Sequence, residues 1–379
     1  MFTRRQAIVA LSAASCAGCS IQPLKPAEPG RGWVVSKGVR ILGSAFSGRS
    51  VIETEAAFGI GSPFRIASIT KLIVAMAIYE WAARRYLNLN ETVSDILPNT
   101  HEGVTLSNLL SHRSGLKDPD VYWAEIETDI RTLFDKSDFT HKPDTYFRYA
   151  NLNYGLAATV VEARLGERFD LLIWKWLTRQ GLDAGLNWSG VSPRKRKKAA
   201  ALYRKSDTGD WAPTVDAPSD IPLASPTYLG RDRVGLKTYQ LASNGTLFSP
   251  QGGMRMSLGD LLRIGRQLQS NPTFNTPVWT NNGQNAETES NHFLSFGPAN
   301  YIYSADASPI PGVPLVGHLG EAYGAYTGLF IVPGTELVFA FAQLGTAQEG
   351  LTMTGTTPNQ SIEHQSLFDE LAPTLRAHI

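Results

Sequence analysis

Residues 64–86, FRIASITKLIVAMAIYEWAARRY, decide the fold because they place a serine and a lysine at the head of a long apolar segment. From Ser68 to Tyr86 the apolar residues leave little polar face over the first turns, which predicts a helix buried nearly all round. Ser68 and Lys71 are three residues apart, so they lie on one face of that helix. The first turn of a helix favours negative charge, and a buried lysine can lose its proton. Ser68 is therefore a candidate nucleophile activated by Lys71, with a plain helix N-cap as the alternative.

The pattern Ser-x-x-Lys also occurs at Ser114–Lys117 and at Ser192–Lys195. Gly115 follows the first of these serines directly and indicates the end of a short helix. The second serine opens a basic stretch. Only Ser68 begins a long buried helix, so it is the favoured nucleophile. The basic run Arg194 to Lys198 is expected to be a solvated face, and its alternative is contact with an anionic cell-envelope surface.

Strands are expected towards both ends of the chain and helices in its middle, which is an α+β arrangement. The second of the C-terminal strands is apolar without alternation, so we expect both of its faces to be covered. Trp174, Trp176 and Trp188 are expected in the core. The expected strands are Val39–Phe46, Val51–Phe58, Ala325–Val332 and Glu336–Leu344, and the expected helices are Asn151–Leu165, Asp170–Gln180, Leu258–Leu268 after an N-cap at Ser257, and Ile362–Ala377.

This order predicts two lobes. An antiparallel sheet flanked by helices is formed by residues 33–85 and 285–379, and a mostly helical lobe, residues 86–284, is inserted within it. The cleft between the two lobes is the expected site.

The first nineteen residues resemble an export signal. Arg4 and Arg5 are followed by the apolar run Ala7 to Ala14, which is too short to span a bilayer, and then by Cys19. We expect residues 1–19 to be the signal, residues 20–32 to be a tether, and Cys19 to be lipidated, which anchors an exported, periplasmic or cell-envelope protein to the membrane. Cys16 as the lipid acceptor and a plain cleaved signal peptide are the alternatives.

Composition excludes several other classes of function. The chain has 379 residues and two cysteines, and both cysteines lie in the expected signal. The folded part therefore has neither a disulfide framework nor a thiol nucleophile. The seven histidines show no metal-ligand spacing, and no cofactor is expected. The formal net charge of +1 falls to −1 if Arg4 and Arg5 are removed (+1 minus 2), which gives no case for a nucleic-acid partner.

Two further motifs follow Ser68-Ile69-Thr70-Lys71 along the chain. Tyr149-Ala150-Asn151 opens the next strong helix, and His318-Leu319-Gly320 lies at the edge of the C-terminal strands. This order resembles the penicillin-recognising serine hydrolases, which comprise the serine β-lactamases, the penicillin-binding proteins such as D-alanyl-D-alanine carboxypeptidases, and related esterases and D-aminopeptidases. Tyr-x-Asn points to the class C-like branch, and the resemblance extends over about Gly59 to Leu344.

The resemblance implies a role for each residue. Ser68 forms an acyl-enzyme, and Tyr149 acts with Lys71 as the general base. Asn151 holds the lysine and contacts the amide of the substrate. The backbone N–H groups of Ser68 and Glu321 form the oxyanion hole, and Gly320 lets the substrate approach the strand. His318 lines the cleft, where it assists the tyrosine or binds a polar group of the substrate.

Departures from the family pattern bear on the substrate. β-Lactamases of this branch carry Lys-Thr-Gly where this chain has His318-Leu319-Gly320, and Glu321 adds a carboxylate beside the cleft. Like-charge repulsion disfavours an anionic substrate. We therefore expect an ester, an amide or a D-amino-acid peptide, with a β-lactamase or D-alanyl-D-alanine carboxypeptidase as the alternative. An alternative of another class is a non-catalytic envelope-binding or sensor protein.

Overall fold

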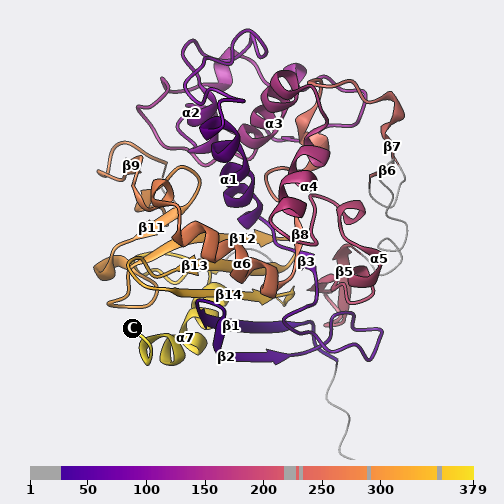
Figure 1. The fold of residues 1–379 in the computed structure, drawn as a ribbon, viewed down its shortest axis with the longest axis vertical. Coiled ribbons are helices and arrows are strands. Elements are labelled where there is room, and N and C mark those ends of the chain that lie inside the picture. The colour runs from indigo at the N-terminus through magenta and orange to yellow at the C-terminus, as the bar shows by residue number, and fades with distance from the viewer. Residues whose placement is uncertain (1–26, 217–227, 230–233, 288–291, 348–351) are drawn as a thin grey trace, which may run out of the picture.

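One antiparallel sheet of eight strands joins the two ends of the chain (Figure 1). This computed structural model describes residues 27–216, 228–229, 234–287, 292–347 and 352–379. The strands lie in the order β2-β1-β14-β13-β12-β11-β10-β9, so the N-terminal hairpin pairs with the last long strand. Their bounds are β1 (Arg31–Lys37), β2 (Arg40–Ser47), β9 (Trp279–Thr280), β10 (Ser295–Phe296), β11 (Tyr301–Tyr303), β12 (Leu315–Ala322), β13 (Ala325–Ile331) and β14 (Leu337–Gln343).

The remaining elements are the α-helices, the short strands of the smaller sheets and the 3₁₀ turns. The α-helices are α1 (Ile69–Ala83), α2 (Leu106–Leu110), α3 (Leu152–Leu165), α4 (Phe169–Arg179), α5 (Pro193–Arg196), α6 (Leu258–Gln269) and α7 (Ile362–Arg376). The short strands are β3 (Phe64–Arg65), β4 (Leu202–Lys205), β5 (Trp211–Val215), β6 (Tyr228–Leu229), β7 (Val234–Gly235), β8 (Arg255–Met256) and β15 (Gly345–Thr346). The 3₁₀ turns are η1 (Ile130–Thr132), η2 (Lys136–Asp138), η3 (Trp188–Gly190), η5 (Leu236–Thr238), η6 (Gly245–Phe248), η7 (Pro272–Asn275) and η8 (Ala305–Ala307).

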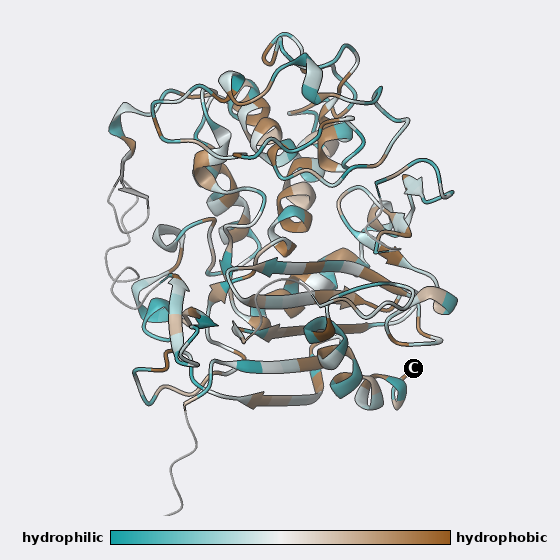
Figure 2. Cartoon of the chain, turned by 180° about the vertical axis from the view of Figure 1, so that it is seen from behind, coloured by the Kyte–Doolittle hydropathy of each residue, from teal (hydrophilic) through white to brown (hydrophobic). Residues whose placement is uncertain are grey.

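Helices cover both faces of the sheet. Along β14, Val338 packs in one apolar cluster with α6, while the neighbouring Phe339 packs in a second cluster with α7. Residues 337–342 are all buried, which confirms the prediction of a strand covered on both faces. Figure 2 shows the hydrophobic colouring concentrated on the inner strands and helices, with hydrophilic colouring on the outer loops.

The apolar segment after Ser68 forms α1 as predicted. Each of its first ten residues, Ile69 to Ile78, is buried, because α1 contacts the sheet through β12 and β13 and the helical lobe through α4. Two other predicted helix boundaries are also confirmed. Gly166 ends α3 with a left-handed φ of 67°, and Ser257 caps α6 in a reciprocal capping box with Asp260.

Some local predictions were wrong. Residues 51–58 form a turn and loop, in which Val51 and Phe58 are buried while residues 53–57 between them are exposed. The strand that pairs with β2 is instead β1, which begins at Arg31. Trp176 and Trp188 lie in the core as predicted, but Trp174 is 41% exposed.

The sheet also takes elements from outside the ranges predicted for it. Helix α6 packs on β13 and β14, and β9 is a strand of the sheet, although both fall within residues 86–284. The first two residues of β1 fall within the predicted tether, and the predicted signal, residues 1–19, lies outside the described residues. Within the described part of the chain, none of the helices has the length and apolar character needed to cross a bilayer.

Candidate active site

A cleft of about 1190 Å³ lies where the start of α1, the start of α3 and the strand β12 meet. Ser68, Tyr149, Asn151, Gly320 and Glu321 all line it, although they are far apart in the sequence. The fold therefore brings the sequence-predicted residues to one place. Lys71 and His318 have no exposed surface and lie behind this wall.

Ser68 occupies the N-cap position of α1, but its hydroxyl caps nothing. The Lys71 amine donates a hydrogen bond to the Ser68 hydroxyl at 3.2 Å, and the Tyr149 phenol lies close enough to this hydroxyl for the two groups to interact. The preceding residue, Ala67, has a φ of 50°, a left-handed conformation that is costly for alanine. The serine is therefore held at a strained turn with its hydroxyl directed to basic and phenolic groups, which is not the arrangement of a plain helix cap.

Lys71 is buried among acceptors. Its amine lies 2.9 Å from Asn151 Oδ1 and 2.8 Å from the backbone carbonyl of Gln251. Burial lowers the pKa of Lys71 to about 7, and the nearby charge of Asp118 opposes the shift. A lysine with a pKa near 7 can be neutral at neutral pH, and the neutral amine is the form that can accept a proton.

Asp118 is a site residue that the sequence did not reveal. Its carboxylate accepts hydrogen bonds from the backbone N–H groups of Asn151 at 2.7 Å and Leu152 at 2.8 Å, and so caps α3. The Asn151 amide donates to the same carboxylate at 3.1 Å, which turns its oxygen towards Lys71. Burial raises the pKa of Asp118, and these hydrogen bonds oppose the rise. The only sequence signal was its position directly after the Ser114–Lys117 match.

The Tyr149 ring packs against two aromatic side chains. Its centroid lies 4.2 Å from that of His112 and 5.3 Å from that of Phe293, and the Lys71 amine lies 4.7 Å from its centre. Burial raises the pKa of the Tyr149 phenol, while its hydrogen bond with Ser68 lowers it. The phenol therefore stays protonated at neutral pH, and Lys71 is the more readily available base of the two.

The prediction that His318 lines the cleft was wrong. Its ring is fully buried, 5.0 Å from the ring of Tyr301 and 6.4 Å from that of Tyr149, and its Nδ1 is hydrogen-bonded with the Leu319 carbonyl. Burial lowers the pKa of His318 to about 3, so the ring is neutral. It supports the tyrosine from behind through the aromatic cluster of β10 and β11, and its neighbour Leu319 forms the wall.

Gly320 allows β12 to pass close to the turn before Ser68. A Cβ at this position would lie 2.6 Å from the Ile66 carbonyl oxygen and closer still to Thr327 Oγ1. The sequence predicted that Gly320 makes room for the substrate, but the atoms that leave no space for a side chain here are those of Ile66 and Thr327. The next residue, Glu321, is exposed on the cleft wall, as the sequence predicted.

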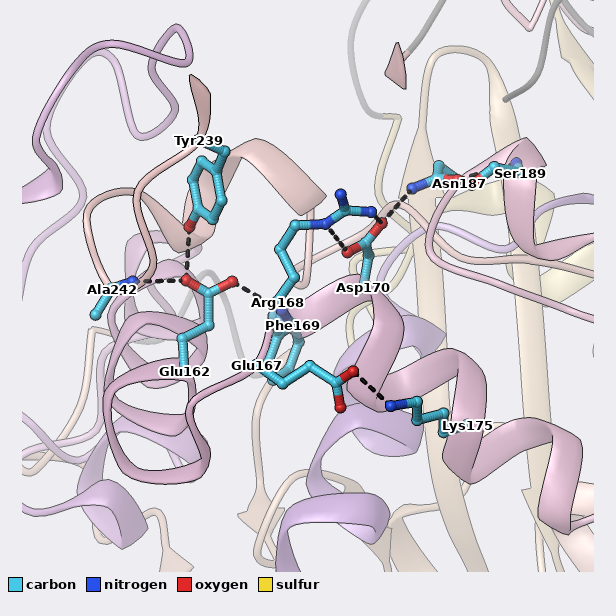
Figure 3. A network of polar contacts seen from close by, with 10 residues as sticks. All are labelled: Glu162, Glu167, Arg168, Phe169, Asp170, Lys175, Asn187, Ser189, Tyr239 and Ala242. Atoms are coloured by element: carbon cyan, nitrogen blue, oxygen red, sulfur yellow. Dashed lines mark hydrogen bonds and ion pairs between the residues drawn. The ribbon is translucent and has the colours of Figure 1, made fainter. Parts of the chain in front are cut away.

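Contacts deeper in the helical lobe support the far wall of the cleft (Figure 3). Glu162 accepts hydrogen bonds from the backbone N–H groups of Phe169 and Ala242 and from the Tyr239 hydroxyl, at 2.6–2.9 Å. Asp170 pairs with Arg168 at 2.8 Å and accepts from the side chain of Asn187 at 3.4 Å. The Arg168 guanidinium lies over the Phe248 ring, and Phe248 and Asn187 both line the cleft.

The other two Ser-x-x-Lys matches are structural. The Ser114 hydroxyl is buried and donates to Asn153 Oδ1 at 2.7 Å, and Ser192 caps α5. Within the basic run, Lys195 forms an ion pair with Asp260, and Arg196 donates to the Val191 carbonyl at 2.8 Å. The remaining three cations of the run, Arg194, Lys197 and Lys198, are exposed.

The described residues contain no group of three or more histidine, cysteine or acidic side chains placed to hold a metal ion. What the cleft offers is a serine hydroxyl, a buried amine of lowered pKa, a phenol and a carboxamide within hydrogen-bonding reach of one another. This is the set of groups needed to form and resolve a covalent acyl-serine.

Solved structures with the same fold include several hydrolases. The beta-lactamase/D-alanine carboxypeptidase from Yersinia pestis aligns with a TM-score of 0.65 and 16% identity, over 92% of this chain and 94% of that one. The D-amino acid amidase from Ochrobactrum anthropi SV3 aligns with a TM-score of 0.63 and 17% identity, over 92% and 94%. A penicillin-binding protein homologue from Pyrococcus abyssi aligns with a TM-score of 0.64 and 18% identity, over 91% of this chain and 73% of that one.

Sequence comparison gives the family. Protein flp of Staphylococcus aureus (strain MW2) is 25% identical over 148 residues, which are 35% of this chain, and the match spans only 30% of that protein. The profile of the beta-lactamase family, in contrast, matches residues 20–350, which include Ser68, Lys71, Asp118, Tyr149, Asn151, Gly320 and Glu321. Taken with the fold and the serine-lysine-tyrosine geometry, this match shows that the chain belongs to the beta-lactamase family of serine hydrolases.

Proposed function

We propose that this protein hydrolyses an ester, an amide or a D-amino-acid peptide through an acyl-enzyme on Ser68. The observation that carries the proposal is the 3.2 Å contact between the Lys71 amine nitrogen and the Ser68 hydroxyl oxygen, across which a neutral amine can accept the hydroxyl proton, together with burial that lowers the pKa of Lys71 to about 7. A lysine that is neutral near pH 7 and touches a serine at a helix start supports a role as the base for that serine.

Each step of the reaction has a group to perform it. Neutral Lys71 takes the Ser68 proton as Oγ bonds to the acyl carbon, and the negative charge on the acyl oxygen is stabilised by the N–H groups of Ser68 and Glu321. The oxyanion then collapses and the leaving group departs with a proton from the Tyr149 hydroxyl, which Lys71 replaces. Water attacks the acyl-enzyme as Lys71 accepts its proton, and the acid is released with the Ser68 hydroxyl restored.

The charge on the cleft wall supports a neutral or cationic acyl donor. Glu321 stands next to the oxyanion position, and the wall there lacks the lysine and the threonine hydroxyl of the Lys-Thr-Gly motif. A carboxylate at this place attracts a protonated amine and repels a carboxylate. The D-amino acid amidase that shares the fold has been solved with D-phenylalanine, which carries such an amine beside a carboxylate. An amide or ester of a D-amino acid keeps the amine and lacks the carboxylate, which favours it as the substrate class.

A second candidate is a β-lactamase or D-alanyl-D-alanine carboxypeptidase. Arg65 lines the cleft three residues before the nucleophile, where its guanidinium donates to the Gly252 carbonyl at 2.9 Å and to Ser249 Oγ at 3.1 Å. The positive charge of Arg65 at the cleft is the observation that favours an anionic substrate. A non-catalytic envelope-binding role is disfavoured, because such a role requires none of Ser68, Lys71, Tyr149 and Asn151.

We further propose that the protein is exported and held at the cell envelope by a lipid on Cys19. The residues before that cysteine are small and follow a basic and an apolar segment, which supports lipoprotein processing. Expression of the full chain and of Cys19→Ala, with fractionation and mass spectrometry, tests this. The wild type should be in the membrane fraction with an added lipid mass, and Cys19→Ala should not. An unlipidated wild type would contradict the proposal.

The test of catalysis uses the soluble chain that begins at Ser20. Wild type and Ser68→Ala are labelled with a fluorophosphonate and with a fluorescent penicillin, and Ser192→Ala is the matched control. Wild type and control should label equally with the fluorophosphonate, and Ser68→Ala should not. Equal labelling of all three, or a wild type that neither labels nor turns over activated esters, would exclude the proposed function. D-amino-acid amides, simple esters, D-Ala-D-Ala peptides and a cephalosporin then distinguish the two substrate classes.

A further inference from the structure

A histidine from the C-terminal helix contacts the strand that carries the proposed oxyanion hole. His364, in the first turn of α7, is only 3% exposed, and its Nε2 lies 3.2 Å from the carbonyl oxygen of Gly320. Its Nδ1 lies 2.6 Å from the hydroxyl of Ser361, the N-cap of the same helix. Both side chains line the cleft, and neither belongs to the motifs that carry the chemistry.

The partners of His364 fix its tautomer. The Gly320 carbonyl can only accept a hydrogen bond, so Nε2 carries the proton and donates it. Nδ1 is then an acceptor and receives a hydrogen bond from the Ser361 hydroxyl. The Ser361 oxygen in turn accepts a hydrogen bond from the His364 backbone N–H at 3.3 Å. Burial also lowers the pKa of His364 to about 3, so the ring is neutral at physiological pH and has one N–H to give.

The contact reaches the proposed oxyanion donor through a single peptide group. The Gly320 carbonyl and the Glu321 N–H belong to the same planar trans unit and point in opposite directions. A donor that holds the carbonyl therefore fixes the direction of the N–H. It also polarises the peptide, which makes the N–H a better donor to a negative oxygen.

A second contact ties this peptide to the nucleophile. The Thr327 hydroxyl, on the neighbouring strand β13, donates to the Ile66 carbonyl at 2.9 Å and lies 3.3 Å from the Gly320 carbonyl oxygen. Ile66 is two residues before Ser68, whose own N–H is the other proposed donor. The Gly320 carbonyl is thus held from α7 by His364 and bridged to the Ser68 segment by Thr327.

We propose that His364, oriented by Ser361, is a positioning residue that aims the Glu321 N–H at the acyl oxygen in the transition state. This inference rests on the proposed function, because it concerns the oxyanion hole of that reaction. It assigns α7, which lies beyond the family match, a part in catalysis that is separate from its packing on the sheet.

The experiment compares the soluble wild type with His364→Phe, His364→Gln, Ser361→Gly and the matched control Gln365→Ala. Phenylalanine keeps an aromatic ring without a donor, glutamine restores a donor, and glycine is tolerated at an N-cap but removes the orienting hydroxyl. The substrates are p-nitrophenyl acetate and its thiono analogue, whose larger sulfur fits an oxyanion hole poorly. Melting temperatures show that each variant is folded.

We expect His364→Phe to lower kcat for the acetate about tenfold, less than the loss of a direct oxyanion donor, with KM little changed. The preference for the acetate over the thiono ester should fall in parallel. His364→Gln should recover most of the lost kcat and most of the lost preference. Ser361→Gly should have values between those of His364→Phe and the wild type, and Gln365→Ala should match the wild type. A folded His364→Phe with wild-type kcat and wild-type preference would overturn the inference.

If His364→Phe does not fold, Ser361→Gly and His364→Gln still test the proposed role of His364. Wild-type kcat and preference in Ser361→Gly would overturn the inference, and so would a loss in His364→Gln as large as that expected for phenylalanine. These outcomes are distinct from failure of the proposed function itself, in which the wild type would neither label at Ser68 nor turn over either ester.

Discussion

The amine nitrogen of Lys71 lies 3.2 Å from the Ser68 hydroxyl, one turn further along α1. The two residues are three apart, so the helix brings them together without help from the rest of the fold. What the fold adds is burial of the amine, which lowers the pKa of Lys71 to about 7, and the two acceptors that aim it, Asn151 and the Gln251 carbonyl.

The rate of Ser68 acylation should therefore rise with pH through about 7 and then level off. The neutral amine is the form that accepts a proton, and its fraction grows as the pH passes the pKa of Lys71. Stopped-flow measurement of p-nitrophenol release between pH 5 and 9 checks this. Lys71→Arg, which stays protonated, should lose about 10²- to 10⁴-fold in rate at every pH. A flat pH profile for the wild type would contradict this role.

Asp118→Asn should move that pH profile to lower pH. The negative charge of Asp118 raises the pKa of Lys71, so its removal lowers the pKa further. The same change weakens the cap on α3 and should reduce the free energy of unfolding by about 1–2 kcal/mol. Asp120→Asn, an exposed neighbour, is the control and should change neither quantity. An unshifted profile in a folded Asp118→Asn would show that the carboxylate does not act on the lysine.

Gly320→Ala should reduce acylation strongly even though alanine adds only a methyl group. The added Cβ would meet the Ile66 carbonyl at 2.6 Å and Thr327 Oγ1 closer still, so β12 must move away from the Ser68 turn. Gly59→Ala is the control, because a Cβ at that position would meet no atom within 4 Å. Steady-state kinetics and melting temperatures distinguish a local shift from unfolding. Full activity in Gly320→Ala would refute the required close approach.

Glu321→Gln should reduce the selectivity for cationic over anionic acyl donors. Loss of one charge near the solvent is worth about 1 kcal/mol, or about fivefold in the ratio of kcat/KM values. The ratio is measured with the p-nitrophenyl ester of D-alanine and the p-nitrophenyl monoester of succinate. Glu336→Gln, exposed at the far end of β14, is the control and should leave the ratio unchanged. No change in Glu321→Gln would exclude the glutamate as a determinant of substrate charge.

Glu162→Gln should destabilise the helical lobe by about 1–3 kcal/mol, because its buried carboxylate accepts three hydrogen bonds that an amide cannot all accept (Figure 3). Glu167→Gln breaks a partly exposed ion pair with Lys175 and should cost less than about 1 kcal/mol. Chemical denaturation of both variants measures the difference. Equal stability of the two would contradict a supporting role for Glu162.

The sequence predicted those parts of the fold that depend on local pattern. The apolar run after Ser68 predicted a buried helix, the glycine signal predicted the C-terminal end of α3, and the capping signal predicted the start of α6. Residues 51–58 misled because two apolar residues at the ends of a turn resemble a short strand. The proximity of Ser68 and Lys71 was predictable for the same local reason.

What the sequence could not supply depends on contacts between distant segments. Asp118 joins the site only because its loop meets the start of α3, and nothing in its own neighbourhood indicates that meeting. His318 is buried because the short strands β10 and β11 place Phe296 and Tyr301 against it. His364 lies more than forty residues from Gly320, so no motif at either position reports the contact.

The turn at Ala67 bears on how this chain has evolved. An alanine with a φ of 50°, a serine that leaves its helix uncapped and a lysine buried at the cost of its charge all lower the stability of the fold at one place. Mutation would readily relieve each of them, since glycine suits the turn, aspartate caps helices and methionine fills the space of a lysine. If the proposed chemistry is what maintains this costly triplet, relatives kept only for their shape should carry those replacements.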